Sequence, residues 1–106
     1  MTKRLTVRRL QALSAERNYT KHWSLSDWGN ALAGETGEVC NLIKKITRGD
    51  YATDPAKATA LLASELPDVL TYLCLLASAA GIDLQDCTVE KFNAVSTRLG
   101  SPVKAP

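Results

Sequence analysis

Hydrophobic residues recur at helical spacing along the whole chain. In four successive segments an apolar side chain returns every three or four residues, and strand-like alternation with hairpin turns is not seen. The sequence therefore predicts an all-α fold. We expect helices over about Thr6–Asn18, from Ser24 or Ser26 to Arg48, from Pro55 to the residue before Gly81, and from the residue after Asp83 to Leu99.

Capping residues mark most of these boundaries. Ser24 followed by Asp27 resembles a capping box in which Asp replaces the usual Glu. Asp54 is a good N-cap residue before Pro55, which suits the first helical position. Glycines stand where helices are expected to end in a left-handed residue, namely Gly49, Gly81 and Gly100.

Pro67 lies inside the third expected helix. It removes one amide donor, and its ring clashes with the carbonyl of Ala63. Because the apolar periodicity continues beyond it, we expect a kink rather than a stop. The half of the helix after Pro67 is apolar almost all round, which predicts a place in the middle of a bundle. Its most apolar stretch is shorter than the roughly 20 residues of a bilayer span.

Length and composition suggest one ordinary globular domain, residues 1–106, with a net charge of +2, 45% apolar residues and 23% charged residues. This charge indicates no strong field for nucleic acid, and we expect neither a nucleic-acid nor a membrane partner. A small basic cluster near the start comprises Lys3, Arg4, Arg8 and Arg9. We interpret it as the solvated face of the first helix. We expect residues 101–106 to be loose.

The three cysteines are too widely spaced for a metal site, and their odd number does not favour a disulfide framework. Cys40 and Cys74 lie in apolar helical stretches, where free cysteine acts as a small hydrophobe. Together with a start that lacks the pattern of a secretory signal, this favours a reducing compartment and hence the cytoplasm.

Two pairs of acids carry the candidate chemistry. Glu35 and Glu38, and likewise Glu65 and Asp68, are three residues apart and so share one helical face. If the two helices pack antiparallel, all four carboxylates face one gap, where their repulsion calls for a cation. Oxygen ligands suit Mg²⁺ or Mn²⁺. Zinc or iron fits less well, because the only histidine is His22.

The alternative interpretation is that these acids lie on the solvated surface, as a Glu-x-x-Glu pair on a helix usually does. Two features weigh against it. Glu35 lies close to the apolar stripe of its helix, and Gly34 and Gly37 flank the first pair. A glycine inside a helix costs roughly 1 kcal/mol relative to alanine, so we expect something to approach the backbone there. From these residues alone, both interpretations remain open.

The run Gly34–Val39, followed by Glu65–Leu70, resembles the MazG-like nucleotide pyrophosphohydrolases. They belong to the all-α NTP pyrophosphatase superfamily, which includes the dCTP pyrophosphatases and is marked by Glu-x-x-Glu, a spacer and Glu-x-x-Asp. Residues 81–84, 91–93 and Arg98 resemble the C-terminal part of the family, and the likeness covers about Arg17–Gly100. It implies a four-helix MazG-like bundle that oligomerises, as a homodimer or homotetramer with pockets between chains.

The resemblance also implies an enzyme, an acid anhydride hydrolase of nucleotide-pool housekeeping. Such an enzyme hydrolyses a nucleoside triphosphate to the monophosphate and pyrophosphate with Mg²⁺, for which Mn²⁺ is a possible substitute. The implied metal ligands are Glu35, Glu38, Glu65 and Asp68. One glutamate of the first pair would orient the attacking water, and the sequence does not say which.

The remaining candidates are residues for the phosphates and the base. Lys45 is seven residues beyond Glu38 and so roughly on its face, although each cation here could equally be solvated. The phosphate candidates are Lys44, Lys45, Lys91, Asn93 and Arg98, and the base candidates are Tyr19, His22, Trp23 and Trp28.

Pro67 departs from the family, which more often has alanine between the last two acids. This favours one alternative, a catalytically weak helical module that binds a nucleotide or a partner protein. A third possibility is a structural interaction domain whose acids are surface groups. The base and sugar preference and the number of metal ions are left open by the sequence.

Overall fold

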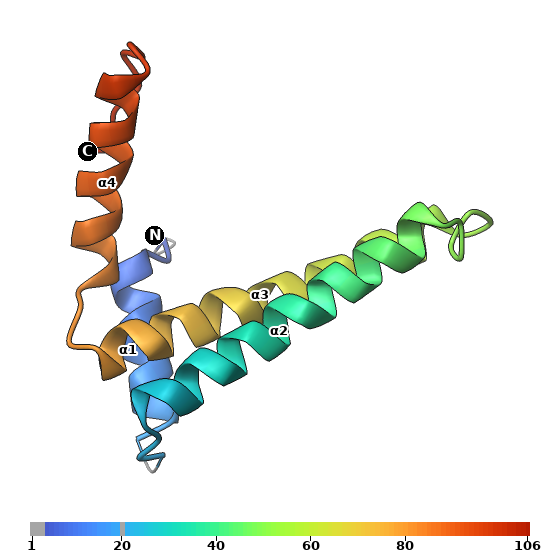
Figure 1. The fold of residues 1–106 in the computed structure, drawn as a ribbon, viewed down its shortest axis with the longest axis horizontal. Helices are drawn as coiled ribbons and strands as arrows, with labels where there is room; N and C mark the ends of the chain where they lie inside the picture. Colours follow the sequence, from blue (N-terminus) through green and yellow to red (C-terminus); the bar gives the residue numbers. More distant parts are fainter. Residues whose placement is uncertain (1–3, 20) are drawn as a thin grey trace.

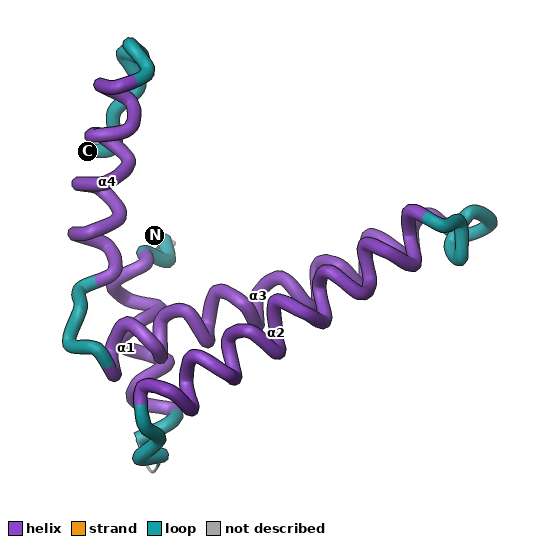
Figure 2. Tube along the Cα trace, viewed as in Figure 1, coloured by secondary structure: helices purple, strands orange, loops and turns teal. Residues whose placement is uncertain are grey.

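The computed structural model describes residues 4–19 and 21–106, which form four helices joined by short connections (Figures 1 and 2). Strands are not found among these residues, so the all-α prediction is confirmed. Lys3, part of the predicted basic cluster, lies outside the described residues. The helices are α1 (Val7–Arg17), α2 (Leu25–Thr47), α3 (Pro55–Ala79) and α4 (Leu84–Arg98).

The helix boundaries follow the predicted caps. The Ser24 hydroxyl accepts a hydrogen bond from the Asp27 amide, and the Asp27 carboxylate accepts one from the Ser24 amide, both at 3.1 Å. The capping box is therefore confirmed. Asp54 and Asp83 also cap their helices with side-chain oxygens. The predicted left-handed positions are confirmed by positive φ angles of 94° at Gly49, 70° at Gly81 and 70° at Gly100.

Helix α3 continues through Pro67, as expected, and the kink there stays a prediction. By length and composition alone, α3 is also long and apolar enough to cross a membrane. Only 17% of its apolar window is buried within the described residues, although α3 packs against both α2 and α1.

The helices form a V rather than a closed bundle (Figure 1). Helices α2 and α3 run antiparallel as a long hairpin, residues 25–79, which we call the hairpin. Helix α1 crosses the open end of the hairpin and packs on α3, and α4 packs on α1. We call α4 and the residues after it, 84–106, the arm. The four helices are as expected, but their expected packing into one bundle does not occur within this chain.

The core is small and lies mostly where α1, α2 and α3 meet. Cys74 is fully buried there, as its apolar surroundings predicted, whereas Cys40 is exposed, contrary to expectation. The buried apolar residues are Trp28, Val39, Leu42, Ala58, Cys74, Leu75 and Ala77.

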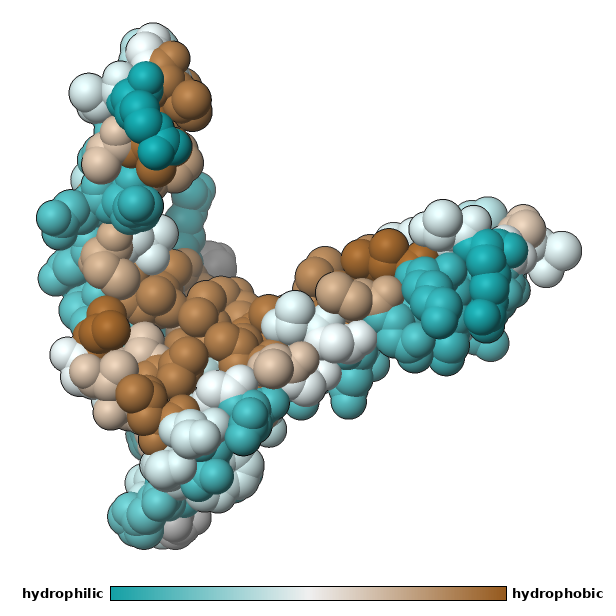
Figure 3. Space-filling view, viewed as in Figure 1, coloured by the Kyte–Doolittle hydropathy of each residue, from teal (hydrophilic) through white to brown (hydrophobic). Residues whose placement is uncertain are grey.

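The central placement predicted for the second half of α3 is wrong for one of its faces. Leu70 and Leu73 remain 43% and 36% exposed, and Leu66, just before Pro67, is 50% exposed, because α1 and α2 cover only the other faces. Figure 3 shows apolar surface gathered in the angle of the V, between the arm and the hairpin.

Polar contacts set the direction of the arm. The Gln11 side chain donates to the Ile82 carbonyl at 2.7 Å and accepts from the Leu84 amide at 2.9 Å. Arg8 pairs with Asp83 at 3.1 Å and also with Asp86. Arg8 therefore joins α1 to the start of α4. Its side chain remains partly solvated, as the basic cluster was expected to be, but it also forms ion pairs that were not expected.

The C-terminal residues are not loose, contrary to expectation. Gly100 turns the chain, and the Asn93 side chain then donates to the Ala105 carbonyl at 3.1 Å and accepts from the Ala105 amide at 2.7 Å. Lys104 adds a hydrogen bond to the Thr97 hydroxyl at 2.6 Å. These contacts fold residues 101–106 back onto α4.

Candidate active site

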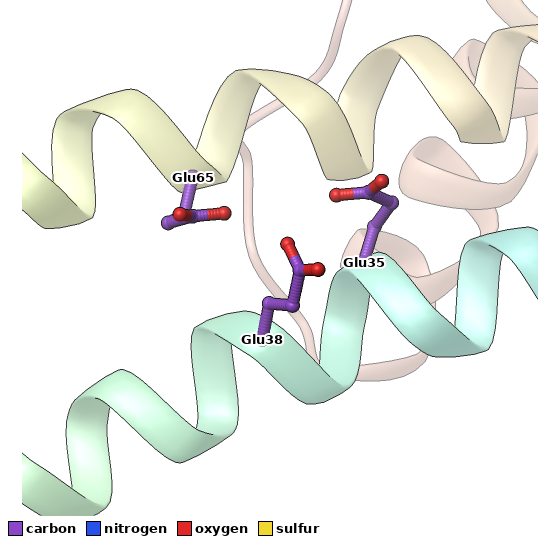
Figure 4. Close-up of side chains that lie close together, drawn as sticks. All are labelled: Glu35, Glu38 and Glu65. Atoms are coloured by element: carbon purple, nitrogen blue, oxygen red, sulfur yellow. The ribbon is translucent and has the colours of Figure 1, made fainter.

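Three of the four predicted metal ligands meet in the middle of the hairpin. Glu35 and Glu38 project from α2 toward Glu65 on α3 (Figure 4), and each offers an oxygen within 4.8 Å of the others. They meet because the i, i+3 spacing puts the α2 pair on one face and the antiparallel packing brings α3 opposite. We call these three residues the acid cluster.

Asp68, the fourth predicted ligand, lies outside this group. It is exposed and one turn further along α3. Its charge still reaches the cluster, since it contributes to raising the pKa of Glu35 and of Glu65.

The surroundings of the acid cluster disfavour the charged forms of Glu35 and Glu65. Burial is the main cause that raises the pKa of Glu35, followed by the charges of Glu38 and Asp68. Burial also raises the pKa of Glu65, followed by its hydrogen bond with Glu38. One Glu35 oxygen, Oε2, is buried without a hydrogen-bond partner among the described residues. Such an acceptor is costly to leave unsatisfied.

The donor set fits a hard divalent cation. The acid cluster offers carboxylate oxygens only, which suit Mg²⁺ or Mn²⁺ better than zinc. A cation there would offset the repulsion between the three carboxylates and would give Glu35 Oε2 a partner. The unpartnered buried oxygen is thus a structural reason, beyond the sequence motif, to regard the cluster as a metal site.

The glycines beside the acid cluster do not contact another part of this chain. A Cβ added to Gly34 or to Gly37 would meet nothing within 4 Å. The expectation that something approaches the backbone there is therefore wrong for the single chain, since this face of α2 is open.

All four predicted base-binding residues line one hollow of about 440 Å³ near the open end of the hairpin. The Trp23 and Trp28 rings lie 4.5 Å apart, and Trp28 is buried two turns before Glu35 on α2. A flat ring suits contact with these aromatic faces, and base binding by these residues stays a prediction. The four are Tyr19, His22, Trp23 and Trp28, which we call the aromatic hollow.

The structure separates the two neighbouring lysines of α2. Lys45 is half-buried and lines a hollow of about 240 Å³ together with Glu38 and Glu65. Lys44 is exposed and does not line it. The geometry therefore favours Lys45 over Lys44 as a phosphate ligand.

The phosphate candidates on the arm do not reach the acid cluster within one chain. Lys91 and Arg98 are exposed on α4, which diverges from the hairpin (Figure 1). The Asn93 side chain is occupied by both backbone groups of Ala105. A phosphate-binding role for Asn93 would require those two hydrogen bonds to break.

Sequence reasoning missed several residues near the site. Tyr72 of α3 lies 6.2 Å from the Trp28 ring, and Lys21 Nζ lies 4.7 Å from the centre of the Trp23 ring. Asn41 and Tyr51 line the same hollow as Lys45. The spacing of Asn41, three residues after Glu38, was the one available signal, because it places both on one face of α2.

Comparison with known proteins gives a consistent picture. The family described as the MazG nucleotide pyrophosphohydrolase domain matches residues 24–98. Mouse dCTP pyrophosphatase 1 is 36% identical over 90 residues, which are 82% of this chain and 53% of that protein. Human dCTP pyrophosphatase 1 is 33% identical over 90 residues, with the same coverage of 82% and 53%. This chain thus spans about half the length of these curated relatives, and no solved structure gives a significant match.

Proposed function

Since this chain belongs to the MazG nucleotide pyrophosphohydrolase family, we propose that it hydrolyses a nucleoside triphosphate to the monophosphate and pyrophosphate. The observation that carries the proposal is the acid cluster, with its unpartnered buried oxygen, between the aromatic hollow and Lys45. A role in clearing surplus or unsuitable nucleotides follows from this activity.

The proposed cofactor is Mg²⁺, with Mn²⁺ as a substitute. Glu35, Glu38 and Glu65 would hold it, with Asp68 as the nearest additional carboxylate. When bound, the cation supplies positive charge that polarises phosphoryl oxygens and stabilises the charge of the transition state.

Residues of the chain bind the nucleotide and position the attacking water. The aromatic hollow binds the base. Glu35 Oε2 would hold the cation, and another carboxylate oxygen of the Glu35 and Glu38 pair accepts a hydrogen bond from the attacking water. The water oxygen bonds to the α-phosphorus and the bond to the bridging oxygen breaks. Pyrophosphate leaves with the electron pair, and the water proton passes to solvent.

We further propose that two or more copies assemble, as a homodimer or homotetramer. The apolar face of α3, and Phe92 and Leu99 of the arm, are exposed within the chain, and apolar surface gathers in the angle of the V (Figure 3). A second copy that fills this angle would bury them and would bring a partner's arm, with its Lys91 and Arg98, toward a hairpin. We place the assembly in the cytoplasm, in keeping with the exposed free thiols of Cys40 and Cys87.

The experiment is pyrophosphate release from a panel of ribo- and deoxyribonucleoside triphosphates, first with Mg²⁺, then after EDTA, and then with Mg²⁺ or Mn²⁺ restored. We expect turnover that EDTA abolishes and either metal restores. Failure to turn over any member of the panel with either metal would contradict the proposal.

A second candidate function is nucleotide binding without turnover. Pro67, between Glu65 and an Asp68 that lies outside the acid cluster, favours it. Tight magnesium-dependent binding without hydrolysis by the parent, and hydrolysis by Pro67→Ala, would establish this alternative.

A further inference from the structure

The acid cluster lies between two hollows of different chemistry along the hairpin. Toward the open end is the aromatic hollow, two helical turns from Glu35 along α2. Toward the turn between α2 and α3 is the hollow of about 240 Å³ that holds Lys45, which we call the tip hollow. Glu38 and Glu65 themselves line the tip hollow, so it opens directly onto the acid cluster.

The tip hollow offers hydrogen-bond donors as well as charge. Asn41 and Lys45 follow Glu38 by one and two turns, and side chains on a helix lean toward its N-terminus, so Lys45 leans back toward the acid cluster. Tyr51 enters from the turn after α2 and is half-buried. An ammonium, an amide and a phenol thus converge on one side of the cluster.

Lys45 is not committed to an ion pair with any carboxylate among residues 4–19 and 21–106. The ion pairs found in this part of the chain join Arg8 to Asp83 and Asp86, and Arg48 to Asp50. Asp50, which feels the charge of Lys45, has both of its oxygens hydrogen-bonded to Arg48, at 2.9 and 2.7 Å. The Lys45 ammonium therefore remains available for an anion.

We infer that the tip hollow binds the pyrophosphate end of the substrate, with Lys45 as the cationic ligand and Asn41 and Tyr51 as hydrogen-bond donors. This inference rests on the proposed function. The bond that is cleaved separates the monophosphate from pyrophosphate, so the acid cluster must lie between the two products. The aromatic hollow suits the product that carries the base, and the cationic tip hollow suits the other. The nucleotide then lies along the hairpin with its base toward α1.

The test is product inhibition, measured from monophosphate formation at fixed free Mg²⁺. For Lys45→Gln we expect the inhibition constant of inorganic pyrophosphate to rise about tenfold, as for the loss of one charge-assisted hydrogen bond. The inhibition constant of the nucleoside monophosphate stays within about twofold of the parent. Tyr51→Phe shifts the pyrophosphate constant in the same direction by less. Lys44→Gln, the matched control, changes neither constant.

Three outcomes would overturn the inference: unchanged pyrophosphate inhibition in Lys45→Gln, a rise for the monophosphate alone, or an equal rise for both products. Unchanged melting temperatures would show that the variants are folded. If the parent hydrolyses no nucleotide, the proposed function has failed separately. Calorimetric binding of magnesium pyrophosphate to the parent, Lys45→Gln and Lys44→Gln then decides whether the tip hollow binds this anion.

Discussion

The hairpin and the arm are both built from amphipathic helices, but they differ in how closely they pack against the rest of the chain. The hairpin packs α2 against α3 over its length and brings carboxylates from both helices within 4.8 Å. The arm meets the rest of the chain mainly at α1, through polar contacts near its start, and leaves Phe92 47% and Leu99 72% exposed.

This difference separates the site that one chain forms from the contacts that the proposed assembly would add. Local spacing and one antiparallel contact suffice to form the acid cluster and the two hollows beside it. The cations of the arm lie where no single-chain contact brings them to the acids. A catalytic centre within the hairpin and a dependence of the arm on a second copy are therefore two separable claims.

The largest expected effect lies within the hairpin. Glu65→Gln removes a carboxylate of the acid cluster, and we expect turnover to fall by about 100-fold or more, as when one transition-state charge contact is lost. Asp68→Asn, matched in chemistry but outside the cluster, should cost only about tenfold. Steady-state rates with Mg²⁺ measure both, and an equal loss would show that Asp68 is as central as Glu65.

The next effect concerns the arm. Phe92→Asp places a charge on the apolar surface, and we expect self-association to weaken by about tenfold or more, since buried aromatic residues anchor interfaces. Light scattering across a concentration series measures this, with Glu90→Gln on the same helix as the control. A Phe92→Asp protein that associates like the parent would remove the arm from the interface.

Asn93 distinguishes a structural role from a role in binding. Asn93→Ala loses both hydrogen bonds to Ala105, so we expect the free energy of unfolding to fall by about 1 kcal/mol. KM for the nucleotide should stay the same. Thermal melts and kinetics check the two parts, and a raised KM with unchanged stability would restore Asn93 as a phosphate ligand.

The smallest effect is at the joint between α1 and the arm. Hydrogen bonding from the Asp86 amide, and then from Arg8, lowers the pKa of Asp83 below its ordinary 3.8. A lowered carboxyl pKa stabilises the fold above the unfolded pKa, and this contribution is lost as the pH falls through the folded pKa. Asp83→Asn should therefore melt slightly below the parent at pH 7, and the two should converge in acid. A gap that persists below the folded pKa of Asp83 would show that the effect does not come from its charge.

Sequence was a good guide wherever a contact is local. Ser24 with Asp27, and the positive-φ glycines, fix helix ends through neighbours three or four residues away, so pattern alone located them. The acid cluster needed one further assumption, that the two acid-bearing helices pack antiparallel.

The remainder depends on contacts between distant residues, which periodicity does not report. Gln11 with Ile82 and Leu84 directs the arm away from the hairpin. Asn93 with Ala105 orders the last residues. Spacing alone placed Lys45 roughly on the face of Glu38, but not the hollow that Tyr51 of the following turn lines together with it.

The measurement that tests the central claim most directly is pyrophosphate release with Mg²⁺ by the parent, Glu38→Gln and Glu90→Gln. Glu38 belongs to the acid cluster, and Glu90 is an exposed glutamate of the arm. The expected result is turnover by the parent and by Glu90→Gln, with a loss of about 100-fold or more in Glu38→Gln. Turnover by Glu38→Gln at the parental rate would contradict a catalytic centre in the hairpin.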